Sequence, residues 1–422
     1  MAVIKPFAAL RPAKEKAGQV SCQPFDSGSK ELAANEIKNN PNSYLHVVKP
    51  YLHFKGEKKN PEKHFPIGLE YLHKFINEGV LIKDQTPAFY IYRMIVGSHA
   101  YTGIIAAASV EDYMNNKILK HENTLTEKQN EIAEHIQYYN SLGNPVLLTY
   151  PDDQQIDLVI DQYIHNHVPE YNFISSDQKK HNLWVVSKQS DIELIEQRFA
   201  SIPYLYIADG HHRSAGSAAY GERMISQKGK GNGNESYHYF PVCLIPFSKL
   251  TIFEYHRLVR DKARVNASDF LEKIKHYFHT VPSGSLPVQP LNKGEFGIYY
   301  QHKAYLLSLK DEYKSQLNGI LDQLDVSIVE EFILKNIFDI KDSKSDFRLS
   351  FMDGGKGIGH LQETVDSGEY DLAITLYPTS IEEVKDVAEN NLIMPPKSTW
   401  IEPKIRTGLL ILSHGENEVV GQ

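Results

Sequence analysis

The stretch Tyr204–Tyr220, YLYIADGHHRSAGSAAY, contains the signals that decide the fold around it. Its apolar run Tyr204–Ala208 predicts a short buried strand, and Asp209-Gly210 is a turn signal. The small residues from Ser214 to Ala219 favour a helix that packs closely against its neighbours. The sequence therefore predicts a strand, a tight turn and a closely packed helix in succession.

The predicted turn is crowded with polar side chains, namely Asp209, His211, His212 and Arg213. A packed core does not need four such groups at one junction. The N–H groups and the dipole at a helix N-terminus favour an anion, and Gly210 lets a ligand approach the backbone. Arg213 is suited to bidentate contact with a phosphate or carboxylate. We therefore predict an anion site, against the alternative in which Asp209 only caps the helix and a histidine belongs to the core.

The same turn suggests a metal centre as a second interpretation, because aspartate and histidine side chains bind metal ions and the turn contains Asp209, His211 and His212. Adjacent histidines do not share a helix face as an i, i+4 pair does. Arg213 is also a poor neighbour for a cation. The anion site is therefore preferred, and no metal ligands are predicted.

Composition limits the classes of function. The 422 residues include 41% hydrophobic residues, which is typical of a folded chain, and the net charge is −8. This acidic balance argues against broad binding to nucleic acid, which needs basic surface. No run approaches about 18 apolar residues, and the N-terminus lacks a signal-peptide pattern. Neither Cys22 nor Cys243 stands in a CxxC pair. We expect a cytoplasmic protein without a membrane segment.

Strand and helix patterns alternate along the chain and predict an α+β (mixed α/β) fold, with a mixed β-sheet, packed helices and a smaller C-terminal α/β part. Phe89–Val96 and Tyr101–Ser109 are two apolar runs joined by a short loop, which indicates a β-hairpin. Tyr44–Val48 is also predicted to be a strand.

A proline- and glycine-rich link from Pro282 to Pro290 is the best candidate for a domain boundary. We therefore predict an N-terminal domain over residues 1–281 that contains the DGHHR turn. A C-terminal α/β domain is predicted over residues 291–422, and its last segments could pack on the first domain.

Phosphate chemistry at the turn would also need a base. A hydroxyl that attacks a γ-phosphate is helped by a carboxylate that accepts its proton. Asp26, Asp209 and Glu122 are candidates, and Glu122 follows Lys120-His121, although a solvated helix start is the preferred interpretation of that triplet. Lys397, between prolines and a Ser-Thr pair, could supply a cation, with a solvent-facing lysine as the alternative. His256-Arg257 is interpreted as a structural hydrogen bond or salt bridge.

Motifs spread along nearly the whole chain resemble one known family. They are PFAALRP, QPFDS, FYIYR with GIIAAASVEDY, KHENTL, LYIADGHHR, LDVSIVEE, DSGEYDLAITLYPTS and MPPKSTWIEPKIRTGLL. In this order they resemble the bacterial and archaeal domain-of-unknown-function family numbered 1015. The resemblance indicates a family rather than an activity, because the biochemistry of that family is largely unassigned.

The DGHHR turn and its small-residue helix are also similar to the Gly-x-His-Arg turn of the ParB and sulfiredoxin superfamily. That superfamily includes nucleotide-binding partition proteins, sulfiredoxin and archaeal free-serine kinases. The resemblance implies that Gly210, His212 and Arg213 bind nucleotide phosphates. His211 stands where sulfiredoxin has its reactive cysteine, so sulfiredoxin chemistry is not expected.

These observations lead to the hypothesis of a nucleotide-dependent small-molecule phosphotransferase of the free-serine-kinase type. ATP or ADP with Mg²⁺ would be the cofactor, and an amino acid is a candidate substrate. The kinases also use an acidic base from an upstream segment; it does not align with one residue here, and Glu15 and Asp26 lie in the corresponding region. The residues expected to be catalytic are Asp209, His211 and Glu122, and those expected to contact the nucleotide are Gly210, His211, His212, Arg213, Ser214 and Lys397.

Two alternatives remain open. The first is a nucleotide-binding regulatory protein without turnover, which in the partition-protein branch would be followed by a basic helix-turn-helix that this sequence does not show. The second is a metal-dependent hydrolase that uses Asp209, His211 and His212.

Overall fold

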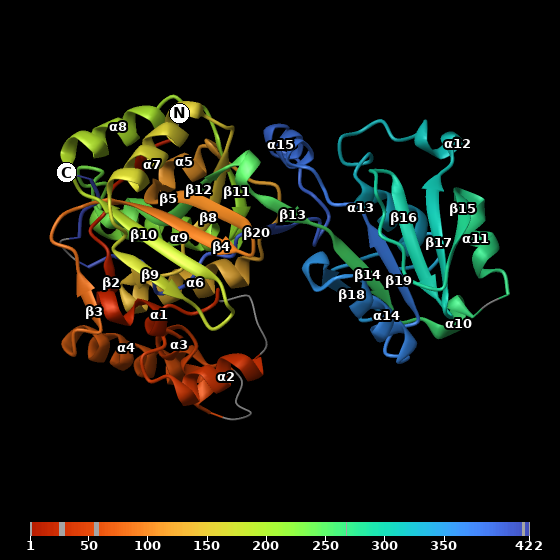
Figure 1. The fold of residues 1–422 in the computed structure, drawn as a ribbon, viewed down its shortest axis with the longest axis horizontal. Coiled ribbons are helices and arrows are strands. Elements are labelled where there is room, and N and C mark those ends of the chain that lie inside the picture. Colours follow the sequence, from red (N-terminus) through yellow and green to blue (C-terminus); the bar gives the residue numbers. More distant parts are fainter. Residues whose placement is uncertain (1, 25–29, 55–58, 267, 416–417, 422) are drawn as a thin grey trace. The chain divides into compact units, whose positions relative to one another are not determined.

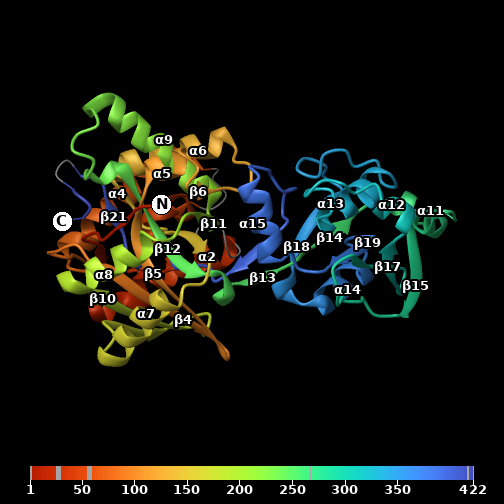
Figure 2. The ribbon, with the colours of Figure 1, turned by 90° about the horizontal axis from the view of Figure 1, so that it is seen from above.

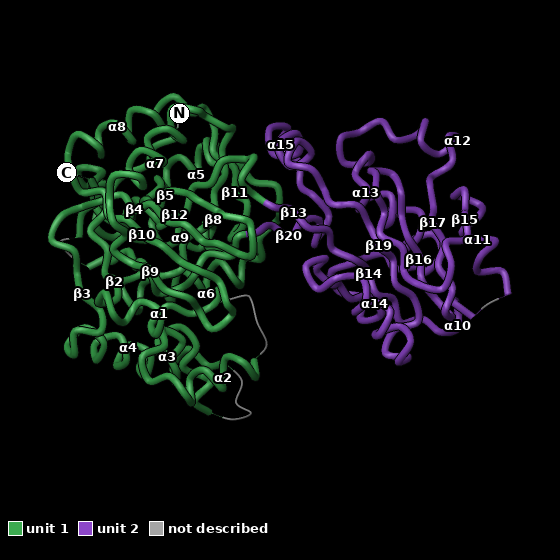
Figure 3. Tube along the Cα trace, viewed as in Figure 1, with its two compact units in different colours: residues 1–250, 403–422 green, residues 251–402 purple. Residues whose placement is uncertain are grey.

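The computed structural model describes residues 2–24, 30–54, 59–266, 268–415 and 418–421. The chain divides into two compact units, residues 1–250 with 403–422 and residues 251–402 (Figure 3). Both units combine a β-sheet with helices, which confirms the predicted mixed α/β class.

The division between the units does not fall in the Pro282–Pro290 link that the sequence suggested. β15 (Phe278–Gly284) runs into this link and pairs with β17 (Lys303–Leu309) in the sheet of the second unit. The carbonyl of Val288 then accepts a hydrogen bond from Thr375 Oγ1 at 2.6 Å. The proline- and glycine-rich composition therefore marks a loop inside one unit.

The first unit is built on a mixed sheet of nine strands (Figure 1). They are β1 (Ile4–Lys5), β4 (Phe89–Val96), β5 (His99–Ser109), β6 (Ile118–Leu119), β8 (Val146–Tyr150), β9 (Tyr171–Ile174), β10 (Lys180–Val186), β11 (Leu205–Asp209) and β12 (Tyr239–Pro246). Their order is β6-β11-β8-β12-β5-β4-β10-β9, and β1 also pairs with β5. β11 is parallel to β6 and β12 is parallel to β8, whereas the other pairs are antiparallel. The predicted hairpin is confirmed as β4 and β5.

The centre of this sheet is covered on both faces. Every residue of β8 and β12 is buried, which explains why both read as unbroken apolar runs rather than as alternating patterns. β11 lies beside β8, so the strand that leads into the DGHHR turn is anchored in the best-packed part of the sheet.

Nine α-helices accompany the described part of this unit. They are α1 (Ala17–Val20), α2 (Lys30–Asn39), α3 (Leu45–Val48), α4 (Pro61–Asn77), α5 (Val110–Met114), α6 (Thr126–Tyr139), α7 (Gln154–Asn166), α8 (Gln189–Phe199) and α9 (His211–Lys228). α6 and α9 lie side by side (Figure 2). A Cβ atom at Gly216 of α9 would lie 2.5 Å from Ile132 Cγ2 of α6, so the small residues of α9 permit the close packing that the sequence predicted.

The predicted strand at Tyr44–Val48 is wrong, because α3 occupies this segment. All four residues of α3 are buried, and the helix packs against α4. A short apolar run that is buried all round has the same pattern in a strand and in one turn of helix, so periodicity could not separate them.

Residues 403–422 return to the first unit through short pairings with segments far away in sequence. Thr407 bridges Cys22, Ile411 bridges Leu10, and β21 (Leu412–Ser413) pairs with β7 (Ser141–Leu142). A second small sheet joins β2 (Leu10–Pro12) and β3 (Leu81–Lys83).

The second unit is built on a six-stranded antiparallel sheet in the order β15-β17-β16-β19-β14-β18. The strands not yet given are β14 (Tyr255–Val259), β16 (Glu295–Tyr300), β18 (Leu349–Asp353), β19 (Leu372–Leu376) and the separate pair β13 (Thr251–Phe253) and β20 (Trp400–Glu402). The helices are α10 (Lys262–Val265), α11 (Phe270–Tyr277), α12 (Asp311–Lys314), α13 (Asp325–Ile328), α14 (Ile358–Asp366) and α15 (Ile381–Glu389). α13 continues directly into a π-helix over Val329–Lys335.

Among the described residues, none of the helices combines the length and the apolar character needed to cross a bilayer. Cys22 and Cys243 are both buried and unbonded to each other.

Candidate functional site

The DGHHR turn joins the end of β11 to the start of α9. The pairing of β11 with β8 shifts register between Ile207 and Asp209, so the strand is already irregular where the turn begins. Gly210 follows with φ of 102°, a left-handed conformation that glycine adopts without strain. Gly210 has no side chain to cap the helix, and the N–H groups of the first helical turn have no partner within the helix. The start of α9 therefore has the backbone geometry expected of an anion site.

Asp209 is paired with two cations. Its Oδ1 atom accepts from Lys404 Nζ at 2.5 Å, and its Oδ2 atom accepts from Arg213 Nη2. Burial raises the pKa of the Asp209 carboxyl, but the charges of Lys404 and Arg213 outweigh that effect and hold the pKa below 3.8. Asp209 is therefore an ionised partner in a charge cluster and a weak proton acceptor.

Arg213 is buried and bound mainly by protein. Its Nη1 atom donates to Asn144 Oδ1 at 3.1 Å and to the carbonyl of Pro145. With Nη2 bonded to Asp209, only Nε lacks a partner among the described residues. The predicted bidentate contact with phosphate would require these bonds to be exchanged, so in this geometry Arg213 supplies positive charge rather than an open fork.

His211 connects the turn to the loop that precedes α6. It is 4% exposed, and its Nε2 atom accepts from the backbone N–H of His121 at 3.4 Å. Burial, together with the neighbouring His121, His212 and Arg213, lowers the pKa of His211 well below 6.5, so the ring is neutral. Because Nε2 accepts, the ring proton is on Nδ1, which lies 3.5 Å from Glu122 Oε2. His211 thus directs an N–H group at the Glu122 carboxylate.

His212 makes the second connection to the same loop. Its Nε2 atom accepts from the backbone N–H of Leu125 at 3.2 Å. Leu125 is the residue before α6, and it provides no side-chain cap for that helix. The adjacent histidines therefore bring the starts of α6 and α9 together, and two helix N-termini contribute positive potential to one place.

The loop also brings a further cation and the accessible acid of the site. Lys120 Nζ lies 4.2 Å from the centroid of the Tyr113 ring, and burial lowers the pKa of its ammonium. The Glu122 side chain is 44% exposed. A role for Lys120, His121 and Glu122 near the chemistry was one of two interpretations of the sequence, and in the structure His121 and Glu122 contact His211 of the turn.

Other predicted residues lie elsewhere. Ser214 is fully buried, and its hydroxyl donates to the carbonyl of Gly210 at 3.3 Å, within the first turn of the helix. Lys397 is an exposed residue of the second unit, whereas the turn belongs to the first. Glu15 is exposed in a short 3₁₀-helix, and Asp26 lies outside the described residues.

Lys404 and Asn144 were not predicted, although both contact the charge cluster. Lys404 is 195 residues away from Asp209 in sequence, so no local spacing indicates the pair. Its only signal in the sequence is its place in the motif MPPKSTWIEPKIRTGLL, which also contains Lys397.

The three residues considered for a metal centre are each bonded to protein. Asp209 has two cationic partners, and His211 and His212 accept separate backbone N–H groups. Across the described ranges, no three His, Cys, Asp or Glu side chains are grouped in a way that could hold a metal ion.

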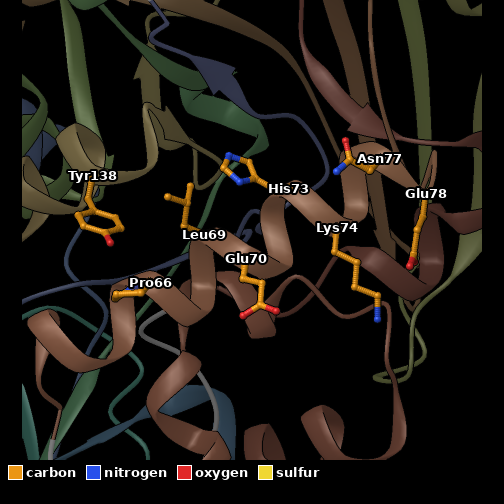
Figure 4. Close-up of a pocket in the computed structure, with 8 residues that line it drawn as sticks. All are labelled: Pro66, Leu69, Glu70, His73, Lys74, Asn77, Glu78 and Tyr138. Atoms are coloured by element: carbon orange, nitrogen blue, oxygen red, sulfur yellow. The ribbon is translucent and has the colours of Figure 1, made fainter.

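An open groove of about 570 Å³ lies along α4 in the same unit (Figure 4). It is lined by Pro66, Leu69, Glu70, His73, Lys74, Asn77, Glu78 and Tyr138. Tyr138 is twelve residues along α6 from Thr126, which corresponds to about 18 Å at 1.5 Å per residue. The groove is therefore separate from the turn, and no predicted site residue lines it.

Several solved structures resemble this chain weakly. A free serine kinase in complex with AMP has 14% identity and a TM-score of 0.33, covering 73% of this chain and 91% of its own. A conserved hypothetical protein from Pyrococcus furiosus has 14% identity and a TM-score of 0.33, covering 73% and 95%. A truncated SbnI from Staphylococcus aureus has 11% identity and a TM-score of 0.37, covering 74% and 87%.

A search of the curated proteins gives no match. A family model described as "Protein of unknown function (DUF1015)" matches residues 4–327, which is well over half of the chain. Most of the motifs that carried the sequence resemblance, including KHENTL and LYIADGHHR, lie inside this range, whereas DSGEYDLAITLYPTS and MPPKSTWIEPKIRTGLL follow it. The chain belongs to the DUF1015 family.

Proposed function

We propose that this protein is a nucleotide-dependent phosphotransferase that binds phosphate at the start of α9 and transfers a phosphoryl group to the hydroxyl of a small molecule. The observation that carries the proposal is the convergence of two helix N-termini on one charge cluster, held together by His211 and His212. Serine-type substrates follow from the resemblance of the DGHHR turn to the superfamily that contains free-serine kinases.

The charge balance at the turn favours an anionic ligand. Asp209 contributes −1, and Lys404 and Arg213 contribute +2, so the trio carries a net charge of +1. The partial positive charges of the α6 and α9 N-termini add to this potential. Gly210 keeps the backbone N–H groups open to a close approach by phosphate oxygens.

Glu122 is the group best placed to act as a base. It is the accessible carboxylate beside the turn, and the N–H of neutral His211 orients it. A carboxylate in this position accepts the proton of an attacking hydroxyl while cationic groups balance the charge of the phosphates. Asp209 is not suited to this role because two cations hold its pKa low.

The residues of the site fit a nucleotide accompanied by Mg²⁺. Mg²⁺ is usually held by one or two carboxylates together with phosphate oxygens. Glu122 would be the carboxylate that reaches it, because its side chain is 44% exposed, whereas Asp209 is paired with two cations. The ion would supply charge neutralisation on the transferred phosphate.

A nucleotide-binding protein without turnover is the second candidate. This candidate is favoured because polar groups of the turn are already bonded to protein. The bonded groups are the terminal nitrogens of Arg213 and the Asp209 carboxylate. The metal-dependent hydrolase is not proposed, because its three ligands do not form a common site.

The two candidates are separated by incubating the purified protein with ATP or ADP, Mg²⁺ and a panel of hydroxyl compounds that includes free serine. We expect a phosphorylated product, with a rate about 10²–10⁴-fold lower in Glu122→Gln because general-base catalysis is lost. Glu134→Gln, an exposed change on α6, should leave the rate unchanged.

Nucleotide binding without product would support the second candidate. The absence of both product and nucleotide-dependent thermal stabilisation would contradict both.

A further inference from the structure

The second unit contains a buried arginine whose hydrogen-bonding capacity is only half used. Arg257 in β14 is 0% exposed. Its Nη1 atom donates to the carbonyl of Tyr255, and also to the carbonyl of Lys397 at 3.2 Å. Its Nε and Nη2 atoms have no hydrogen-bond partner among the described residues. Since the sequence analysis interpreted His256-Arg257 as a structural pair, this unpaired edge was not expected.

The two unpaired nitrogens form one edge of the guanidinium. Nε–H and the adjacent Nη2–H point in nearly the same direction, and this edge is the one that binds two oxygens of a carboxylate or phosphate side-on. Nη1, by contrast, holds the turn at Lys397. Arg257 therefore uses only Nη1 for its hydrogen bonds to the described protein. The edge formed by Nε and Nη2, which is suited to an oxyanion, has no acceptor among the described residues.

No carboxylate of the described chain fills this role. Glu330, on the π-helix, is the acidic group that acts most strongly on Arg257, but its Oε1 atom accepts from Ser343 Oγ and no bond joins it to the guanidinium. Burial lowers the pKa of Arg257 to about 10, so the group remains charged at neutral pH. A buried cation without a hydrogen-bonded counter-ion is costly to keep, and proteins normally supply one.

A second cation lies on the same side of β14. Tyr255 and Arg257 are two residues apart in one strand, so their side chains share a face. Lys397 Nζ lies 5.2 Å from the centroid of the Tyr255 ring, and in the described chain it forms no ion pair. Lys397 also has φ of 56°, a conformation that is uncommon for lysine and is often found at ligand sites.

An aromatic ring lies beside each of these two cations. The Arg257 guanidinium lies 5.1 Å from the centroid of the Phe351 ring on the neighbouring strand β18. Tyr255 meets Trp400 edge to face, with 5.8 Å between the ring centroids. Low-polarity surroundings of this kind strengthen a charge-assisted hydrogen bond.

We infer that Arg257 and Lys397 form an anion-binding site in the second unit, independent of the site at α9, for a small organic carboxylate or a phosphate. The ligand accepts two parallel hydrogen bonds from Nε and Nη2 of Arg257, and Lys397 Nζ supplies the second charge. Because the Arg257 edge is buried, the ligand reaches it only when the side chains packed over that edge move. The site at α9 does not use the MPPKST motif, and the second site gives this motif a role.

The test follows the ¹⁵N–¹H signal of Arg257 Nε in the full-length protein during titration with sodium phosphate or sodium malonate, against sodium chloride at matched ionic strength. The signal is assigned by its loss in Arg257→Lys or, if that variant does not fold, by the shift caused by removing the ring current in Phe351→Leu. We expect a saturable shift with at least one of the two oxyanions and none with chloride. The oxyanion that gives the tighter titration identifies which ligand source the site prefers.

Lys397→Asn is the matched functional variant, because asparagine tolerates a positive φ and the side chain is exposed. It should weaken binding by roughly fivefold or more, within the range of one lost charge-assisted contact. Lys341→Asn, which removes another exposed charge of the same unit, should leave binding unchanged.

An Arg257 signal that does not respond to either oxyanion up to about 10 mM, where a millimolar site would be filled, would overturn the inference. A response that is equal in Lys397→Asn and the unmodified protein would overturn the part assigned to Lys397. The Nε signal reports only on Arg257, so anion binding at α9 does not affect the outcome.

Discussion

Asp209 is the residue on which the charge balance of the turn depends. Its two partners come from very different places, Arg213 from the first turn of α9 and Lys404 from the C-terminal segment. The pairings keep the carboxylate ionised and leave one positive charge in excess.

Replacing Lys404 by methionine keeps the apolar stem but removes the charge, so Asp209 loses one of its two partners. We expect the unfolding free energy to fall by about 1–3 kcal/mol, the usual cost of losing a hydrogen bond to a charged group. Lys38→Met, an exposed change on α2 in the same unit, is the control. Equal urea midpoints for the two variants would show that the Lys404 pair does not contribute.

The contribution of Asp209 should depend on pH. Because its folded-state pKa lies below 3.8, the ion pairs stabilise the protein fully above that value and are lost as the pH falls through the lower, folded-state pKa. The difference in unfolding free energy between the unmodified protein and Asp209→Asn should therefore be constant from pH 5 to 7 and shrink below about pH 4. A difference that grows on acidification would contradict the assigned direction of the pKa shift.

At the scale of elements, the start of α9 depends on the backbone freedom of Gly210. An added Cβ atom would lie 2.8 Å from Arg213 Cζ, in addition to the strain of φ at 102°. Arg213 can therefore fold back onto Asp209 only because residue 210 has no side chain.

Gly210→Ala should destabilise the protein by about 1–3 kcal/mol through backbone strain and should also weaken phosphate binding by displacing Arg213. Gly229→Ala is a control for an added Cβ atom at positive φ without crowding, since Gly229 has φ of 83° and nothing within 4 Å of the added Cβ atom. Gly229→Ala should lose stability through backbone strain but should leave phosphate binding unchanged. Thermal unfolding and phosphate titration of both variants measure the two effects, and identical behaviour would mean that crowding of Arg213 is unimportant.

The sequence predicted these elements where the pattern was local. The apolar run of β11, the turn at Asp209-Gly210 and the small residues of α9 each have a short-range signal, and so does the β4–β5 hairpin. Tyr44–Val48 failed because its burial on all sides removes the periodicity that distinguishes a strand from a helix. Lys404 was missed because its contact with Asp209 depends on how the last segment folds back, which no local pattern encodes.

At the scale of the whole molecule, the chain leaves the first unit at residue 250 and returns to it at residue 403. The second unit is therefore one continuous segment, whereas the first needs two. The sequence suggested a boundary inside the second unit because loops and linkers share the same proline- and glycine-rich composition.

We expect residues 251–402 to fold cooperatively when expressed alone, because this unit has its own buried core around β14, β16 and β19. Residues 1–250 alone should be less stable than the same segment joined to residues 403–422, since only the latter supply Lys404 to Asp209 and β21 to β7. Circular dichroism and urea unfolding of the three fragments provide the measurement. A disordered 251–402 fragment would show that the second unit depends on the first.

The most direct test of the central claim is a crystal structure of the full chain grown with ADP and Mg²⁺. The account predicts a phosphate group within hydrogen-bond distance of the backbone N–H groups of His211–Arg213, with Glu122 facing the open side of that phosphate. Nucleotide bound elsewhere, or a saturated crystal with no phosphate at the start of α9, would contradict it.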